Sequence, residues 1–233
     1  MRKLYCLLMF LIGLTIFGGT TTVQAADNDY GIKIDGNFSD WADKKKTDIQ
    51  SNDDRYNIKH EALLADGKNI YFYLNMSPNH GNGYKNLQPA GYELRVGDKL
   101  FWLTIQDPYN LQINEKRAVK IWAYEQDDTG GGVNEILPNA KAYISRVRNN
   151  DDPTINNGST DKMEFEIPFS DLKAVSTTSQ KVTMHNGNLG NQTLTTEGGS
   201  TGPVILAISG LAIAMFGIIK IPKISELRKS LHE

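Results

Sequence analysis

The feature that most constrains this chain is an alternation of apolar and polar residues with a period of two. The segment Ile70–Met76 places apolar side chains at every second position, and Met163–Phe169 repeats the pattern with Glu164 and Glu166 on its other face. This is the period of a β-strand, in which successive side chains point to opposite faces. Both segments are therefore predicted to be half-buried strands.

Similar short runs continue along the chain, separated by Gly, Asn, Asp and Pro, with no amphipathic helical stretch of a dozen residues between them. This spacing favours two packed antiparallel sheets over a parallel α/β sheet. Gly97-Asp98 is predicted to form a tight hairpin turn that needs a positive φ. We expect an all-β antiparallel sandwich of about nine strands. The other predicted strands cover 58–64, 91–96, 99–106, 118–125, 140–147 and 181–186.

The start of the chain has the features of a secretory signal peptide. Two basic residues precede an apolar run, Leu4–Phe17, and small residues surround the expected cleavage after Ala25. The run falls short of the ~20 residues that span a bilayer, so an uncleaved anchor is the less favoured alternative. The single cysteine, Cys6, lies in this segment, and the mature chain therefore has no disulfide.

The apolar segment near the C-terminus differs from the N-terminal one in the residues on either side of it. Residues 203–221 are almost entirely apolar and are predicted to form one transmembrane helix, and the basic tail 222–233 is expected to stay in the cytoplasm. Residues 187–202 are rich in Gly, Asn, Thr and Ser and are predicted to be a flexible tether. Residues 26–186 are then a single extracellular domain of a single-pass cell-surface protein.

The charge of the chain limits its partners. The whole chain has 25 basic and 27 acidic residues, and the basic ones concentrate at the two ends, which leaves about six excess acidic residues for the domain. A mildly acidic surface repels nucleic acid and other anionic polymers at long range. We therefore expect no nucleic-acid partner.

The tail resembles the Firmicu-CTERM sorting signal. The resemblance is carried by the lead-in Gly198–Pro203, the apolar helix and the basic residues from Lys220 to Lys229. It implies recognition by an exosortase-like membrane enzyme of Gram-positive bacteria, with Thr201, Gly202 and Pro203 at the sorting site. The helix would then be a processing signal, whereas a plain single-pass anchor remains the alternative.

The domain resembles the family 9 carbohydrate-binding modules, a β-sandwich group related to the DOMON-like folds. Three motifs in order carry the resemblance: Ile32–Trp41, with its Ile-Asp-Gly and Asp-Trp pairs, Asp66–Phe72, and Glu164–Leu172. The resemblance implies a sandwich across nearly the whole domain. These motifs are structural, and Trp41 is expected to plug one end of the core. The sugar-binding aromatics of the family have no residue-by-residue match here.

Candidate binding residues follow from the strand alternation. Trp102 shares its face with Gln106, and Trp122 and Tyr124 share theirs with Lys120, opposite the apolar residues of the same strands. Exposed flat rings beside amides and charges suit a sugar, because the ring contacts its C–H face while the polar groups bond its hydroxyls. The alternative is that loops or neighbouring strands cover these rings. Tyr71 and Tyr73 oppose the core face of their strand in the same way.

Metal binding is a weaker expectation. Adjacent carboxylates occur at 52–54, 127–130 and 150–152, but none has the spacing of a known calcium loop. Solvated turns are favoured, with one structural calcium as the alternative and no other cofactor.

Catalysis has little support in the sequence. No nucleophile-elbow or His-Glu-x-x-His motif occurs. Glu164 and Glu166, about 7 Å apart by strand geometry, would suit glycoside hydrolysis, but an edge strand and simple solvent exposure are expected instead.

The sequence predicts a non-catalytic surface module that binds a carbohydrate, either exopolysaccharide or wall glycan. The alternative is a structural or protein-binding surface module.

Overall fold

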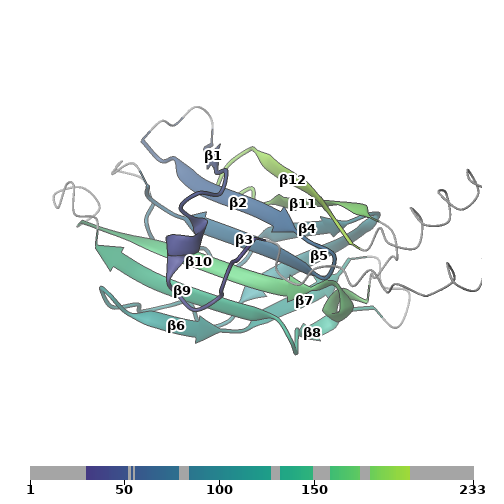
Figure 1. The fold of residues 1–233 in the computed structure, drawn as a ribbon. Helices are drawn as coiled ribbons and strands as arrows, with labels where there is room; N and C mark the ends of the chain where they lie inside the picture. Colours follow the sequence, from purple (N-terminus) through teal and green to yellow (C-terminus); the bar gives the residue numbers. More distant parts are fainter. Residues whose placement is uncertain are drawn as a thin grey trace, which may run out of the picture.

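The computed structural model describes residues 30–51, 54, 56–78, 84–126, 132–148, 158–173 and 179–199. These residues form two packed antiparallel sheets of six strands each (Figure 1). The predicted all-β antiparallel architecture is confirmed, with twelve strands in place of about nine. The described part contains short 3-10 turns, η1 (Phe38–Trp41) and η3 (Phe169–Leu172), and none of its segments forms a helix able to cross a membrane. The predicted signal peptide and transmembrane helix lie outside the described residues.

The two sheets are named A and B. The order in sheet A is β1 (Thr47–Ile49), β2 (Lys59–Ala65), β3 (Asn69–Asn75), β10 (Ser159–Pro168), β9 (Lys141–Arg148) and β6 (Lys116–Val119). The order in sheet B is β12 (Thr193–Gly198), β11 (Gln180–His185), β4 (Tyr92–Val96), β5 (Lys99–Ile105), β7 (Ile121–Glu125) and β8 (Asn134–Ile136).

The main core lies between the sheets and is built from the inward positions of both. Phe72 of β3 stacks on Phe165 of β10 with ring centroids 5.0 Å apart, and Phe101 of β5 is fully buried on the facing sheet. Each such side chain stabilises the fold by about 1.5–3 kcal/mol when it leaves water. The predicted hairpin is confirmed: Val96 pairs with Lys99, and the intervening Gly97 has a φ of 63°.

The outer face of sheet A is covered by the N-terminal part of the domain, which crosses β3 and β10 in Figure 1. Trp41 of η1 is fully buried there and stacks on Tyr73 at 5.4 Å, and Tyr71 joins the same second apolar cluster. The expectation that Trp41 plugs one end of the core is therefore wrong. It closes a separate small core outside the sandwich.

Glu164 joins this covering segment to sheet A. Its carboxylate accepts the backbone N–H groups of Asp35 and Gly36 at 2.9 and 2.7 Å and the Trp41 Nε1–H at 2.8 Å. The expected solvent exposure of Glu164 is wrong, because β10 is a central strand and the side chain is fully buried beneath the segment. Burial raises its pKa to about 7, although the three N–H donors act in the opposite direction.

Two predicted boundaries are also wrong. The strand predicted at 118–125 is two strands, because the chain passes from β6 in sheet A to β7 in sheet B at Lys120. The domain does not end at 186, since β12 lies within the predicted tether 187–202 and pairs with β11 along its whole length. Beyond β12, the Gly199 N–H donates to Asp66 O at 2.9 Å, so the ordered domain extends to Gly199.

Candidate functional site

The three aromatic residues predicted to bind a ligand lie together on the outer face of sheet B. Trp102 of β5 is directly opposite Tyr124 of β7, and Trp122 is one outward position further along β7, opposite Thr104. Their exposed fractions are 36% for Trp102, 43% for Tyr124 and 39% for Trp122. The prediction that these rings point away from the core is confirmed, and no described segment covers them as η1 covers sheet A.

Neighbouring groups hold this surface in place. The Trp102 Nε1–H donates to Gln126 Oε1 at 3.0 Å, which restricts the indole ring. Ile136 of β8, 39% exposed, pairs with Trp122 across the next strand and extends the apolar strip. We call Trp102, Trp122, Tyr124 and Ile136 the aromatic face.

Gln106 and Lys120 lie at one end of the aromatic face, where the chain passes from β6 of sheet A to β7 of sheet B. The Gln106 N–H donates to Lys120 O at 2.9 Å, so the two residues continue the β5–β7 pairing beyond Thr104 and Trp122. Both line a cavity of about 410 Å³, which we call the end pocket. All five predicted binding residues therefore belong to one continuous surface. The remaining residues of the end pocket are Asp107, Arg117, Ala118, Val119 and Ile136.

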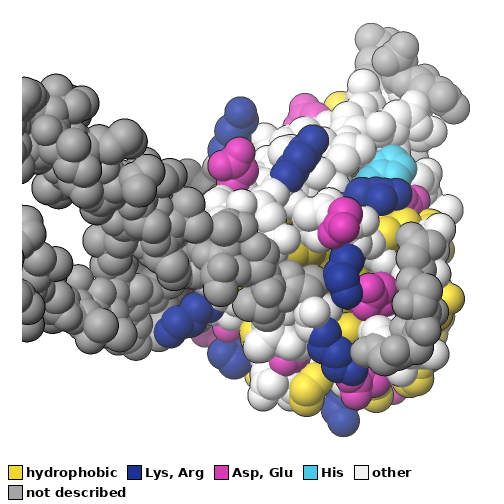
Figure 2. All heavy atoms as spheres, turned by 90° about the vertical axis from the view of Figure 1, so that its right-hand side faces the viewer, with side chains coloured by type: hydrophobic (Ala, Val, Ile, Leu, Met, Phe, Trp, Pro, Cys, Tyr) yellow, Lys and Arg dark blue, Asp and Glu magenta, His cyan; other side chains and the backbone are white. Residues whose placement is uncertain are grey.

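Charges on and around this face are balanced. Glu93 and Arg95 of β4 point outward beside β5, and Lys120 and Asp107 stand at the end pocket. Figure 2 shows basic and acidic side chains interspersed on one side of the described molecule, with hydrophobic side chains between them. The two acidic and two basic side chains named on and around the aromatic face leave it without a strong field to attract a highly charged polymer.

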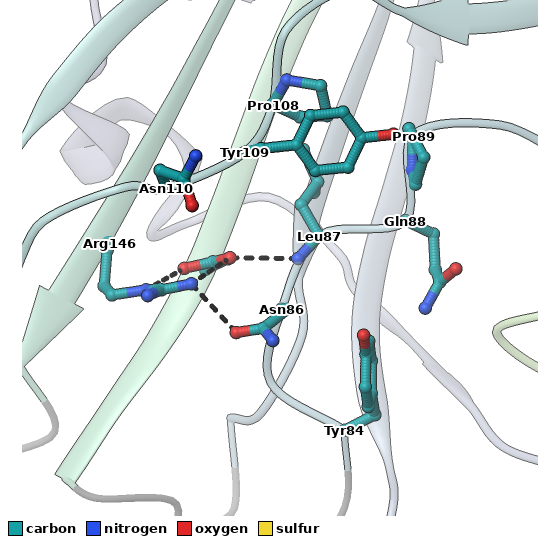
Figure 3. Close-up of a pocket in the computed structure, with 10 residues that line it drawn as sticks. Tyr84, Asn86, Leu87, Gln88, Pro89, Pro108, Tyr109, Asn110 and Arg146 are labelled. Atoms are coloured by element: carbon teal, nitrogen blue, oxygen red, sulfur yellow. Dashed lines mark hydrogen bonds and ion pairs between the residues drawn. The ribbon is translucent and has the colours of Figure 1, made fainter.

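A second cavity, of about 280 Å³, was not predicted from the sequence (Figure 3). Tyr84 and Tyr109 flank it and are 55% and 62% exposed, with amide side chains between them. We call this cavity the tyrosine pocket. Its polar lining is completed by Asn86, Gln88 and Asn110, and its floor by Arg146 and Asp161.

The floor of the tyrosine pocket is an ion pair between the half-buried Arg146 and the buried Asp161. Arg146 donates to both carboxylate oxygens of Asp161, at 2.7 and 2.9 Å, and the Leu87 N–H donates to the same carboxylate at 2.9 Å. Arg146 also donates to Asn86 Oδ1 at 2.8 Å. The bond to Asp161 raises the pKa of Arg146 still further. Because these charges satisfy each other, the pair supports the pocket wall.

One loop separates the two cavities and carries unusual backbone geometry. Asp107, Asn110 and Asn114 have positive φ values of 52°, 59° and 68°. Arg117 fixes this loop by donating to the carbonyl oxygens of Asp107 and Tyr109 at 3.2 and 2.8 Å. Left-handed non-glycine residues are uncommon and concentrate at binding sites. This Asp/Asn-rich loop is the sequence signal that could have indicated the tyrosine pocket.

The paired glutamates on β10 do not form an open acid pair. Both oxygens of Glu164 are occupied by three N–H donors beneath the covering segment. Glu166 lies 3.5 Å from Lys141 Nζ and is only 15% exposed. A substrate cannot reach Glu164 in this arrangement, so the hydrolytic geometry considered for the two residues is absent.

Most of the predicted metal-binding loops and all of the predicted sorting residues lie outside the described residues. Within the described ranges, no group of three or more His, Cys, Asp or Glu side chains could hold a metal ion. Of the three acidic loops, 127–130 and 150–152 lie outside the described residues, and 52–54 is described only at Asp54. Thr201, Gly202 and Pro203 also lie outside them.

Comparisons with known proteins give no relative: no family model, curated protein or solved structure matches the chain. The resemblances to the Firmicu-CTERM signal and to the family 9 modules therefore stay predictions.

Proposed function

We propose that the domain is a non-catalytic carbohydrate-binding module that holds a polysaccharide chain against the aromatic face. The observation that carries the proposal is the placement of Trp102, Trp122 and Tyr124 on adjacent strands of one open sheet face. Consecutive sugar rings of an extended chain can stack on such rings. Hydroxyl groups at their edges meet the amides of Gln106 and Gln126.

The contrast between the two sheets supports this proposal. Sheet A also carries outward aromatics, Tyr71 and Tyr73, but its own N-terminal segment buries both to below 5% exposure. Sheet B leaves three larger or equal rings open to solvent. Exposed rings grouped on one surface are typical of a surface with a ligand, because scattered exposed aromatics need no partner whereas a cluster does.

A neutral glycan suits the electrostatics better than a charged one. The interspersed charges of the surface neither attract nor repel a neutral chain, and neutral hydroxyls require only local hydrogen-bond partners. Exopolysaccharide and wall glycan are both sources of such chains. A structural or protein-binding module without a glycan ligand is the alternative function.

The tyrosine pocket is the alternative position for a sugar, because Tyr109 and Tyr84 could enclose a single ring between them. Binding of soluble and insoluble polysaccharides by the full chain should distinguish the two surfaces. Trp102→Ala combined with Trp122→Ala should weaken binding at least about tenfold, since each ring contributes about 0.5–1.5 kcal/mol beyond its buried area. Tyr109→Ala, which removes a more exposed ring from the tyrosine pocket, should leave the binding unchanged.

The reverse pattern, with loss only in Tyr109→Ala, would move the site to the tyrosine pocket. Absence of binding to every glycan, together with capture of a protein by both variants and the unaltered chain, would sink the carbohydrate function. Circular dichroism and unfolding midpoints of the variants must match the parent, so that lost binding reports a lost contact.

We also infer display on the outside of a Gram-positive cell, through a cleaved signal peptide and a C-terminal sorting or anchoring helix. The supporting features are the apolar segments within 1–25 and 203–221 with their basic flanks. The mass of the mature surface protein tests both steps. A mass that includes Met1 contradicts cleavage after Ala25, and a mass that extends to Glu233 contradicts removal of the helix.

A further inference from the structure

We propose that the end pocket binds an N-acetyl substituent, so that the ligand of the aromatic face is a glycan of N-acetylated hexosamine. This inference rests on the proposed carbohydrate function and names its substrate class. It starts from the position of the pocket. Along the β5–β7 pair the outward positions are Trp102 with Tyr124, then Thr104 with Trp122, then Gln106 with Lys120.

The spacing of these positions suits a sugar chain. Outward positions of a strand repeat every two residues, which is about 7 Å along the strand. A chain lying on Trp122 therefore places the next ring, or a substituent of the same ring, above Gln106 and Lys120. A cavity of about 410 Å³ has room there for a side group together with part of the ring that carries it.

The polar groups of the end pocket match an acetamide. Lys120, Asp107 and Gln106 line the pocket, and none of their side chains makes a hydrogen bond or ion pair with the described residues. An acetamide has one carbonyl acceptor and one N–H donor. The Lys120 ammonium can donate to the carbonyl, and the Asp107 carboxylate can accept from the N–H. The side-chain amide of Gln106 has both a donor and an acceptor beside these two groups.

The apolar groups of the pocket match the methyl of the same substituent. Val119 packs against the core, and Ile136 and Ala118 expose aliphatic carbon to the cavity. A hydroxyl can also donate and accept, but it places no apolar atom against the aliphatic wall. A fully anionic substituent would meet Asp107. The acetamide uses the donor, the acceptor and the apolar wall together.

Neighbouring residues fix the backbone conformation of Asp107. Its φ of 52° is held by Arg117, which donates to the Asp107 carbonyl oxygen at 3.2 Å while its other nitrogen atoms bind Glu115. Arg117 is therefore a positioning residue whose charge is already paired with Glu115. Among the described residues that line the pocket, Lys120 is the cation that forms no ion pair with a described acidic residue.

Calorimetric titration of the full chain with two hexamers tests the inference. One is the β-1,4 hexamer of N-acetylglucosamine and the other is the β-1,4 hexamer of glucose, which differ only in the substituent at C2. The acetylated hexamer should bind at least about tenfold tighter, because one additional charge-assisted hydrogen bond contributes about that factor.

Two variants should abolish this preference, so that each variant binds the two hexamers with equal affinity. Asp107→Gly removes the carboxylate and tolerates the positive φ, and Lys120→Met removes the ammonium but keeps the aliphatic stem. Lys181→Met on β11, a matched change elsewhere on the same sheet face, should keep the full preference. Equal binding of both hexamers overturns the inference and leaves the carbohydrate function standing. A preference that survives in both pocket variants also overturns it, and binding of neither hexamer or of any other glycan overturns the proposed function as well.

Discussion

The substitution Glu164→Gln tests how the covering segment is attached to sheet A. Glutamine keeps one carbonyl oxygen, which can still accept the N–H groups of Asp35 and Gly36. Its amide nitrogen, however, faces the Trp41 Nε1–H, so that two donors meet where a carboxyl oxygen, which keeps a lone pair even when protonated, accepted at 2.8 Å. One buried N–H without a partner costs about 1–3 kcal/mol, and at pH 5 the variant should be less stable by this amount.

The difference in stability between the variant and the parent should shrink as the pH rises. Burial raises the pKa of Glu164 from 4.5 to about 7, so the folded chain binds more protons than the unfolded chain between these values. The contribution of Glu164 to the stability of the parent protein is therefore fully present below pH 4.5 and is lost as the pH rises through 7. The fall attributable to Glu164 is about 3 kcal/mol at 1.36 kcal/mol per pKa unit. Glutamine does not titrate, so the stability gap between variant and parent should close or reverse by pH 8.

Urea unfolding at pH 5 and pH 8, followed by tryptophan fluorescence, measures both effects. Glu61 contributes a fall in the same direction, because burial raises its pKa to about 8, but it is present in both proteins and cancels in the comparison. Glu166→Gln on the same strand face is the matched control and should not reproduce the loss of stability at pH 5, because its contact is with Lys141 rather than with the covering segment. If the gap between Glu164→Gln and the parent stays constant from pH 5 to pH 8, the carboxylate is not the titrating group and the reasoning is wrong.

Three further changes test other parts of the structure. Asp161→Ala removes the acceptor of the half-buried Arg146 guanidinium and of the Leu87 N–H, and should lower the unfolding free energy by about 1.5–3 kcal/mol, measured by urea denaturation. Gly36→Ala places a Cβ at a φ of 74° and 3.2 Å from two side chains, and should lower the melting temperature through a loss of about 1–2 kcal/mol. A chain ending at Asn186 should aggregate because it lacks β12, whereas one ending at Gly199 should give a cooperative thermal transition; equal behaviour would contradict the assignment of β12 to the domain.

The alternation of side chains predicted which way each ring points, and it did so because strand geometry is local. Trp102 and Trp122 point outward from sheet B as expected, and Phe72 points into the core. The hairpin at Gly97 was predictable for the same reason, since two strands and one turn residue lie within a few positions. The two-sheet architecture was predictable as well, because the alternation gives each strand one face for a core and one face for the outside.

Elements with weak local signals were missed. β12 contains one buried apolar side chain, Leu194, in a polar segment, and only pairing with β11 keeps it in the sheet. The strand predicted at 118–125 shows no break in its alternation, so its passage between sheets at Lys120 could not be seen. Edge strands and crossings depend on distant partners, and composition reports these poorly.

The tyrosine pocket was missed for a related reason. Tyr84 and Tyr109 come from different loops, and the ion pair beneath them joins β9 to β10 through Arg146 and Asp161. Each residue taken alone is an ordinary polar or aromatic residue of a loop or strand end. Their convergence exists only after the two sheets have packed.

For the same reason, strand alternation could not predict whether an outward aromatic residue lies on an open binding surface or in a second core. β3 and β5 both carry aromatic residues at outward positions, yet Tyr73 is 4% exposed and Trp102 is 36% exposed. The difference is made by Trp41 and by Glu164, which bind each other across 123 positions of sequence and hold the chain over one sheet only. Because the chain uses its own N-terminal segment to cover sheet A, the described residues leave nothing to cover the rings of sheet B, and those rings are the ones available to a ligand.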